Sequence, residues 1–542
     1  MKRRHLLLTP LAQAAASLGA FTVTDSVQAR SAQSKFAHLE AGVADLQAKL
    51  GAGRLTSRTL VLAYLSRIEA NDRHGPKLHS VIETNPDAVS IAAELDRERR
   101  LGQPRGPLHG IPVLVKDNLA SADRMQTTAG SLALDRTFNG WSDAVRPPRD
   151  SFVVARLRAA GAIVLGKANL SEWANIRSTR STSGWSARGG LVRNPYALDR
   201  NASGSSSGTA AAIAASFATL GIGTETDGSI VSPSAACGLV GIKPTVGLVS
   251  RDGILPISHS QDTAGPMCRS VADAAMLLGA IAGPDPRDPA TQDAPSGIDY
   301  AQALDAGGLR GARIGVLRQW LTGHPATDAV FESALQTLAA QGAVLVDPVR
   351  IDSAEQIAAH EIEVLLTEFK VGVAAWLREF APGAPVQTLA DLIAFNDKHA
   401  ARAMPFFGQE LFLRAEQTGG LADPRYLAAL DNCRRLARTE GIDAALQAHR
   451  LDALVAPTRG PAWLTDLMLG DRHGRGFSSL PAVAGTPHIT LPMGQVAGLP
   501  VNLSLAGGAW SEPTLIRLAF AFEQASRARF APSFARSATL SA

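Results

Sequence analysis

The stretch Asn201-Ala-Ser-Gly-Ser-Ser-Ser-Gly-Thr209 is the part of the sequence around which the rest of the chain is organised. Residues 203–208 are all glycine or serine, a composition that by itself is typical of a flexible linker. From Thr209, however, the chain reads TAAAIAASFATL, a run of small helix-forming residues. Ser205 to Ser207 stand where they can cap the first turn of that helix. The stretch therefore predicts the entry to a buried helix and argues against a linker.

A second serine loop follows closely behind this helix. Leu220–Thr224 predicts a short buried strand, and residues 225–228 predict a turn that presents Ser229. A glycine-rich loop before a helix can also bind phosphate. The P-loop pattern, however, requires lysine after its last glycine, and here Gly208 is followed by Thr209. The two serine loops therefore point to chemistry other than phosphate binding.

Short apolar runs alternate with helical patterns along the chain, which predicts an α/β fold. We expect one large domain over residues 30–542, with a mainly helical excursion at about 353–450 that is interrupted near 380–385. The patterns predict further helices at 37–49, 56–71, 87–100, 152–159, 270–281, 327–341 and 514–525, and further strands at 111–115, 162–165, 313–316, 344–351, 453–457, 488–491 and 500–505.

Residues 1–29 have the organisation of an export signal. A basic cluster in Met1-Lys-Arg-Arg-His-Leu-Leu-Leu8 precedes an apolar run, and Val27-Gln-Ala29 is similar to a small-residue cleavage site. The Arg3-Arg4 pair before leucines resembles a twin-arginine signal, the type used for cargo that crosses a membrane already folded. We therefore expect a protein that is exported, either to the periplasm or to the medium.

The charge and the hydropathy of the chain indicate neither a nucleic-acid partner nor a membrane-spanning helix. The formal charge of the whole chain is +4, of which residues 1–29 contribute two, so only +2 remains without them. Nothing in this balance indicates a nucleic-acid partner. The N-terminal apolar run of about 16 residues includes Pro10 and Gln13, and neither it nor any later run is long and apolar enough for a membrane-spanning helix.

The three cysteines Cys237, Cys268 and Cys433 have no metal-ligand spacing. In an oxidising compartment one pair of them can form a disulfide bond. The alternative, which we favour, is that all three are buried thiols that pack as small apolar side chains.

Lys116 is a candidate base. It ends the apolar run Ile111–Val115, whose continuous hydrophobicity is typical of a strand covered on both faces. The chain has 9 lysines against 44 arginines, so arginine is its usual cation. A lysine can give up its proton in a protein whereas an arginine cannot. The alternative for Lys116 taken alone is a solvated charge at the end of a strand.

Lys116, Ser205 and Ser229 together form a possible catalytic set. A serine needs a base to become a nucleophile, and a buried neutral lysine can serve. Ser205 can relay a proton between Lys116 and Ser229, because a hydroxyl both donates and accepts. The backbone N–H groups of Thr226, Asp227, Gly228 and Ser229 can converge on the oxyanion of a tetrahedral intermediate.

These residues resemble the amidase signature family of Ser–cis-Ser–Lys hydrolases. The resemblance rests on Lys116 in GIPVLVKDN, on ASGSSSGTAAA, and on GTETDGSIV with Ser229 placed 24 residues after Ser205. It runs from about residue 40 to 535 and includes the block AGTPHITLPMG. Within the family, GTETDGSIVSP and GLVSRDGILPISHSQDTAGPM are most similar to the peptide amidases, which remove the C-terminal amide of peptides.

The resemblance implies a role for each residue. Ser229 is expected to be the acyl-enzyme nucleophile, Ser205 the relay serine with a cis peptide bond, and Lys116 the base. The family fold is a mixed β-sheet wrapped by many helices, and it works without a metal or an organic cofactor. A small-molecule or short peptide amide is the expected substrate, with no obligate partner chain. Many members carry arginine two residues after the nucleophile, where this chain has Val231.

Four alternatives remain at this stage. A broader amino-acid or aryl amidase or esterase of the same family would use the same residues. A Ser-His-Asp hydrolase would need one of the 12 histidines, but no G-x-S-x-G elbow follows a predicted strand. An exported solute-binding protein would not need the Lys-Ser-Ser set. An ammonia-handling amidotransferase subunit would need partner chains. We expect the pocket walls to come from residues 120–135, 175–200 and 353–450.

Overall fold

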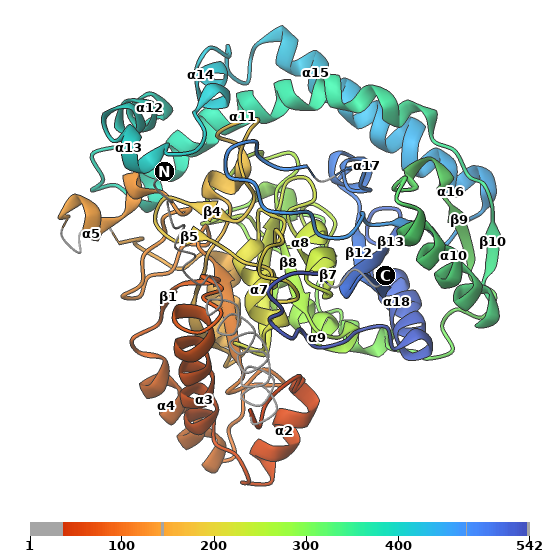
Figure 1. Ribbon diagram of the computed structural model, residues 1–542, viewed down its shortest axis with the longest axis horizontal. Helices are drawn as coiled ribbons and strands as arrows, with labels where there is room; N and C mark the ends of the chain where they lie inside the picture. The colour runs from red at the N-terminus through yellow and green to blue at the C-terminus, as the bar shows by residue number, and fades with distance from the viewer. Residues whose placement is uncertain (1–35, 142–145, 473, 539–542) are drawn as a thin grey trace, which may run out of the picture.

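The computed structural model describes residues 36–141, 146–472 and 474–538. The predicted export signal at residues 1–29 lies outside these ranges. An eleven-stranded mixed sheet forms the centre of the molecule and is surrounded by helices (Figure 1). A separate two-stranded sheet pairs β4 Trp185–Ser186 with β5 Gly190–Leu191. The predicted α/β class with one mixed sheet is therefore confirmed.

The sheet has the strand order β1-β3-β2-β6-β8-β7-β12-β13-β11-β9-β10. Its parallel pairs are β2 with β3 and β6, and β9 with β10 and β11; the other pairs are antiparallel. The strands are β1 Val81–Thr84, β2 Pro112–Lys116, β3 Ile163–Ala168, β6 Leu220–Glu225, β7 Val240–Lys243, β8 Thr263–Cys268, β9 Arg313–Val316, β10 Val344–Val346, β11 Ala453–Pro457, β12 His488–Val496 and β13 Leu499–Ala506.

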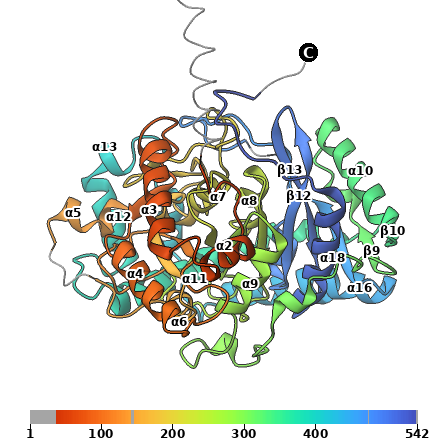
Figure 2. The ribbon, with the colours of Figure 1, turned by 90° about the horizontal axis from the view of Figure 1, so that it is seen from below.

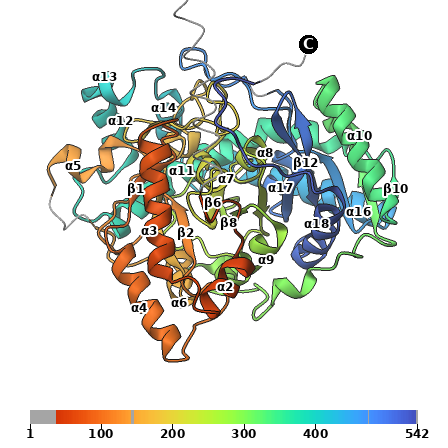
Figure 3. The same ribbon diagram turned by 60° about the horizontal axis from the view of Figure 1, so that its bottom comes forward.

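The helices cover the sheet and extend beyond it. In Figure 3, α3 and α4 lie side by side near the β1 end, and in Figure 2, α18 lies beside the β12–β13 hairpin. The α-helices are α2 Val43–Gly51, α3 Ser57–Ile68, α4 Ala88–Arg100, α5 Arg136–Asn139, α6 Phe152–Ala159, α7 Ser207–Ala214, α8 Val231–Ala236, α9 Val271–Ile281, α10 Pro325–Ala340, α11 Ile357–Phe380, α12 Leu389–Lys398, α13 Ala400–Ala403, α14 Glu410–Glu416, α15 Pro424–Arg434, α16 Asp443–His449, α17 Ser479–Val483 and α18 Glu512–Ser526.

The helix behind the serine stretch, α7, is fully buried and packs against β6. Small side chains make this possible, because they let the helix approach the sheet closely. The serines before it do not cap it through their side chains, contrary to the expectation from the sequence. The Ser206 hydroxyl instead donates to the carbonyl oxygen of Thr224 and accepts from its N–H, at 3.0 and 3.2 Å. This serine therefore fastens the loop to β6.

The helical excursion also has the predicted form. It consists of α11 to α16, and α11 ends at Phe380, where the break is expected. In Figure 1, α11 and α15 run side by side along the top of the molecule. None of the described helices is long and apolar enough to cross a membrane.

Several predicted boundaries differ from those of the structure, and three strands of the large sheet were missed. Helix α2 begins at Val43 rather than at residue 37, and the Val43 N–H donates to Asp273 Oδ1 at 2.9 Å. Strand β10 ends at Val346, two residues before Pro348, which has no N–H for a sheet. The strands β1, β7 and β8 were not predicted, and β8 contains Gly and Pro, which are poor strand formers.

The three cysteines are buried free thiols, as we expected from the sequence. Cys237, Cys268 and Cys433 are all buried, and none of them forms a disulfide bond. They pack in the apolar interior, where Cys237 and Cys268 belong to the core around the sheet and Cys433 to a smaller cluster under α15.

Candidate active site

Lys116 lies at the carboxyl end of β2, between β3 and β6. Its side chain is fully buried, since both faces of this part of the sheet are covered. Its Nζ is 2.7 Å from Ser205 Oγ. The same nitrogen is 2.9 Å from Thr224 Oγ1 and 3.3 Å from the Thr224 carbonyl oxygen. These oxygen neighbours fix the position of the amine at the end of the strand.

Burial also changes the acidity of this amine. Desolvation lowers the pKa of Lys116 from 10.5 to about 7, because the charged form loses its water. The carboxylates of Asp262 and Glu225 oppose this effect and raise the pKa. A lysine with a pKa near 7 is neutral in a large fraction of molecules at neutral pH. It can then accept a proton from Ser205 through the 2.7 Å contact.

The loop that carries Ser205 is tightly enclosed. The Gly204–Ser205 peptide bond is cis, as the family resemblance implies. A side chain at Gly204 would place its Cβ 2.2 Å from the Ser171 hydroxyl, so any larger residue would require Ser171 to move. The Ser205 carbonyl oxygen accepts from the Ser171 N–H at 3.0 Å, and the Ser205 side chain is almost completely buried. Its hydroxyl is therefore held against Lys116.

Ser229 lies in the turn between β6 and α8. The buried carboxylate of Glu225 holds this turn by accepting from the N–H groups of Ile230 and Val231 at 2.7 and 3.0 Å. Gly228 adopts the left-handed region at φ 74°, where a side chain is disfavoured. Ser229 is 8% exposed, whereas Ser205 is 1% exposed. Of the two serines, Ser229 is thus the one that a substrate can reach.

The two serine loops touch each other directly. The Ser206 N–H donates to the Ser229 carbonyl oxygen at 3.2 Å. In the described part of the chain, the hydroxyls of Ser205 and Ser229 make no hydrogen bond to each other. The backbone hydrogen bond keeps the loop of Ser205 in contact with the turn of Ser229.

A cavity of about 380 Å³ opens over Ser229. Its wall includes Gly204 and the predicted oxyanion residues Thr226, Asp227, Gly228 and Ser229. Side chains from 174–183 and Leu365 of α11 contribute to it, as expected, but residues 120–135 do not. The largest contribution comes from residues 458–479, which the sequence did not indicate. Within residues 36–141, 146–472 and 474–538, no group of His, Cys, Asp or Glu side chains could hold a metal ion.

The predicted oxyanion turn is supported from behind by α11 and by the segment before β8. The Thr226 hydroxyl donates to Asp262 Oδ1 at 2.5 Å, and Gln261 Nε2 donates to the Thr226 carbonyl oxygen at 3.3 Å. Gln261 Nε2 is also 3.0 Å from Glu361 Oε1 of α11. These contacts hold the backbone of the turn, whose residues 226–229 line the cavity.

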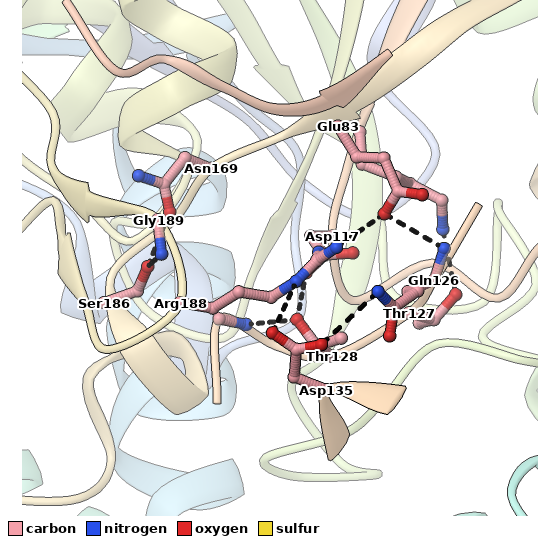
Figure 4. A network of polar contacts seen from close by, with 12 residues as sticks. Glu83, Asp117, Gln126, Thr127, Thr128, Asp135, Asn169, Ser186, Arg188 and Gly189 are labelled. Atoms are coloured by element: carbon pink, nitrogen blue, oxygen red, sulfur yellow. Dashed lines mark hydrogen bonds and ion pairs between the residues drawn. The ribbon is translucent and has the colours of Figure 1, made fainter. Parts of the chain in front are cut away.

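A buried ionic network supports the residue after Lys116 (Figure 4). Arg188 lies between three carboxylates and is 2.6 Å from Glu83, 3.6 Å from Asp117 and 3.5 Å from Asp135. Burial raises the pKa of Asp117, and the charge of Arg188 lowers it. The Thr128 hydroxyl also donates to Asp117. The network thus holds Asp117, the residue that follows the end of β2.

Two residues of the site were missed from the sequence. Thr224 contacts the amine of Lys116, and the pairing of β2 with β6 could have shown this, because parallel neighbours end at one edge of a sheet. Arg459 lines the cavity and donates to Ser203 and Ser232 at 2.9 Å. No local pattern marks Arg459, which lies more than 220 residues from both serines.

A Ser-His-Asp hydrolase could use His109, His259 or His488 as its base, but none of the three lines the cavity. His109 and His488 are fully buried; His109 Nε2 contacts the Leu95 carbonyl oxygen and His488 Nε2 contacts Ser504. Burial lowers the pKa of His488 to about 3. His259 is exposed and faces Glu368. Among the described residues of the cavity wall there is no histidine.

Comparisons with known proteins agree with this geometry. The amidase family model matches residues 59–516. A probable amidase of Arabidopsis thaliana is 42% identical over 512 residues, which cover 92% of this chain and 93% of the plant protein.

Solved structures are also similar to this chain. The native peptide amidase from Stenotrophomonas maltophilia is 55% identical with a TM-score of 0.87, and the match covers 92% of this chain and 99% of that one. A peptide amidase in complex with the competitive inhibitor chymostatin is 56% identical with a TM-score of 0.88, over 91% and 99%. This chain therefore belongs to the amidase family and is a hydrolase that acts on amides.

Proposed function

We propose that this chain removes the C-terminal amide from peptides and releases ammonia, with Ser229 as nucleophile, Ser205 as relay and Lys116 as base. The observation that carries the proposal is the 2.7 Å contact between a fully buried lysine nitrogen and Ser205 Oγ. The adjacent loop presents Ser229 to the cavity. The similarity to peptide amidases supports the choice of a peptide amide as substrate.

The first half of the reaction forms an acyl-enzyme. Ser229 Oγ attacks the amide carbon while its proton passes to Ser205 Oγ and the Ser205 proton passes to Lys116 Nζ. The negative charge on the carbonyl oxygen is stabilised by backbone N–H groups of residues 226–229, where one such donor is typically worth about 2.7 to 4 kcal/mol. The intermediate then expels ammonia, which receives the proton back from Lys116 through Ser205.

The second half restores the enzyme. Water attacks the ester carbon of acylated Ser229, and its proton moves through Ser205 to Lys116. When the second intermediate collapses, Ser229 leaves with that proton and the peptide is released as a free acid. Each cycle consumes one water molecule and returns the three side chains to their starting protonation states.

A substrate panel tests the proposal. An acetylated dipeptide amide, the corresponding free amino-acid amide, an anilide and a methyl ester are compared by ammonia or product release and by mass spectrometry. The dipeptide amide is expected to have the highest kcat/KM, and Ser229→Ala is expected to abolish turnover with the fold intact. Higher activity on anilides or esters would favour the broader amidase, and retained activity in Ser229→Ala would remove Ser229 from its role.

We also propose that residues 1–29 direct export through a twin-arginine route, since Arg3-Arg4 precedes the apolar run. Full-length protein expressed in a bacterium is fractionated and compared with a variant that carries Arg3→Lys and Arg4→Lys. The unchanged protein is expected outside the cytoplasm and the variant inside it. Equal distribution of the two proteins would contradict the proposal.

A further inference from the structure

The guanidinium of Arg459 lies across the two loops that carry the serines. Its Nη1 donates to Ser203 Oγ and to Ser232 Oγ, both at 2.9 Å. The two hydroxyls are also 2.9 Å from each other. Ser203 lies two residues before Ser205, and Ser232 lies three residues after Ser229. A single nitrogen thus connects the loop of the relay serine to the turn of the nucleophile.

The rest of the Arg459 side chain is held in place. Its Nε donates to the Gly460 carbonyl oxygen at 3.3 Å, and its Cζ lies 4.2 Å from the centre of the Trp463 ring. This stacking is a cation–π contact. Arg459 is only 3% exposed, so its rotamer is fixed by the surrounding protein. The same contacts orient the guanidinium toward Ser203 and Ser232.

Burial of this cation is costly for the fold. Desolvation lowers the pKa of Arg459 to about 10, and the charge of Asp471 opposes the effect. The Nη2 group, which is also buried, finds no acceptor among the described residues. A buried charged group with unused donors lowers the free energy of unfolding. A contribution to stability alone therefore does not account for this arginine.

We propose that Arg459 is a positioning residue of the catalytic centre, which holds the Ser205 loop against the Ser229 turn at the distance that proton relay requires. The inference rests on the proposed function, because it assumes that these two serines react. The two hydrogens of Nη1 leave at a fixed angle and can serve both hydroxyls at once. Lysine offers a single charged nitrogen on a flexible stem and can replace this geometry only in part.

Arg459→Met tests the proposal, because methionine keeps an unbranched stem and removes the donors. We expect kcat for a peptide amide to fall about 10- to 100-fold, because a misplacement of reacting groups by about 1 Å can lower the rate by about 100-fold. KM is expected to stay within about threefold, because Nη1 of Arg459 donates to Ser203 and Ser232, although the residue also forms part of the cavity wall. Arg459→Lys is expected to recover part of the kcat. A large rise in KM at unchanged kcat would overturn the proposal.

A double-mutant cycle separates positioning from a general loss of stability. A protein with Ser203→Ala and Ser232→Ala lacks both acceptors of Nη1, and its kcat is expected to fall as well. On that background, Arg459→Met is expected to change kcat by less than about threefold, because the bridge is already gone. Fully additive effects on kcat would contradict the proposal. If Arg459→Met does not fold, the protein with Ser203→Ala and Ser232→Ala tests the proposal alone. A kcat equal to that of the wild type in this protein would contradict the proposal.

Arg269→Met is the matched control. Arg269 is also buried and connects separate segments, with Nη1 donating to the Ile213 and Ala218 carbonyl oxygens and Nη2 to that of Ala41. Its substitution is expected to lower thermal stability but to leave kcat per folded molecule unchanged. An equal loss of kcat in this control would overturn the proposal. If the wild-type protein releases no ammonia from any amide, the proposed function fails, which is a different result from any of these.

Discussion

Lys116 Nζ lies 2.7 Å from Ser205 Oγ at the end of a strand whose side chains are all buried. The sheet creates this pair, because β2 and β6 run parallel and bring Lys116 beside Thr224, to which Ser206 is fastened. Burial lowers the pKa of the Lys116 amine, and the pairing of β2 with β6 sets its distance from Ser205. The same arrangement makes the site sensitive to pH and costly for stability, and each consequence can be measured.

The rate of amide hydrolysis should rise with pH through about 7. Burial lowers the pKa of Lys116 to about 7, and only the neutral amine can take the proton. The ascending limb of kcat/KM against pH is therefore expected to have its midpoint there. Measurements from pH 5 to 9 with a peptide amide test this, with a parallel stability check at each pH. A flat profile over that range would exclude a lysine base.

Lys116→Met should make the protein inactive but more stable. A fall of the pKa from 10.5 to about 7 corresponds to roughly 4 to 5 kcal/mol of unfavourable burial for the charged amine. This cost is complete below about pH 7, where the native amine is charged, and it fades as pH rises towards 10.5, where the unfolded amine also loses its proton. The gain in the free energy of unfolding is therefore expected to be larger at pH 6 than at pH 9.

Urea denaturation of the wild type and of Lys116→Met at the two pH values measures this difference. Lys49→Met provides the control, because Lys49 is partly exposed and pairs with Asp45 on the surface. Its effect on stability is expected to be small at both pH values. A gain for Lys116→Met that does not change with pH would contradict the proposed burial cost.

The residues near the two serines were predictable because their signals are local. Gly204, Ser205, Gly228 and Ser229 occur in two short runs, and the strand before the second run is continuous and apolar. Lys116 was predictable because it ends a strand with no polar residue in it. For these residues, sequence spacing corresponds directly to position at one edge of the sheet.

The remaining parts of the site depend on contacts between distant segments. Arg459 and the largest share of the cavity wall come from residues 458–479, which carry no repeated pattern. Strand β8 was missed because Gly265 and Pro266 weaken the strand signal, although burial between β6 and β7 stabilises it. Such features follow from tertiary packing, which one sequence does not show.

Glu361→Gln should stabilise the protein, and more so at alkaline pH. Burial raises the pKa of Glu361, and the neighbouring charge of Asp227 raises it further. The native carboxyl therefore keeps its proton at pH values where the unfolded chain has lost it, so stability falls as pH rises above the ordinary value of 4.5. Glutamine removes this penalty and can keep a hydrogen bond to Gln261.

The difference in the free energy of unfolding between Glu361→Gln and the wild type is measured at pH 5 and pH 9. Glu363→Gln is the control, since Glu363 lies on the same helix but is only partly buried. We expect the difference in the free energy of unfolding between Glu363→Gln and the wild type to be the same at pH 5 and pH 9. A Glu361→Gln protein that is equally stabilised at both pH values would contradict the raised pKa of Glu361.

Arg188→Met should destabilise the fold and should do so most strongly at neutral pH. Arg188 is the cation between Glu83, Asp117 and Asp135, and its removal leaves Asp117 buried without its ion pair. Breaking a buried ionic pair on one side typically costs about 3 to 5 kcal/mol. Arg188 lowers the pKa of Asp117, so without it that carboxyl takes up a proton at a higher pH and the penalty shrinks as the solution becomes acidic. Urea denaturation at pH 5 and pH 8 should therefore show the larger loss at pH 8.

Arg97→Met removes a cation from an exposed pair with Glu94 and is expected to have little effect on the free energy of unfolding at both pH values. If Arg188→Met were no more destabilising than this control, the network behind Lys116 would have no role in holding the end of β2.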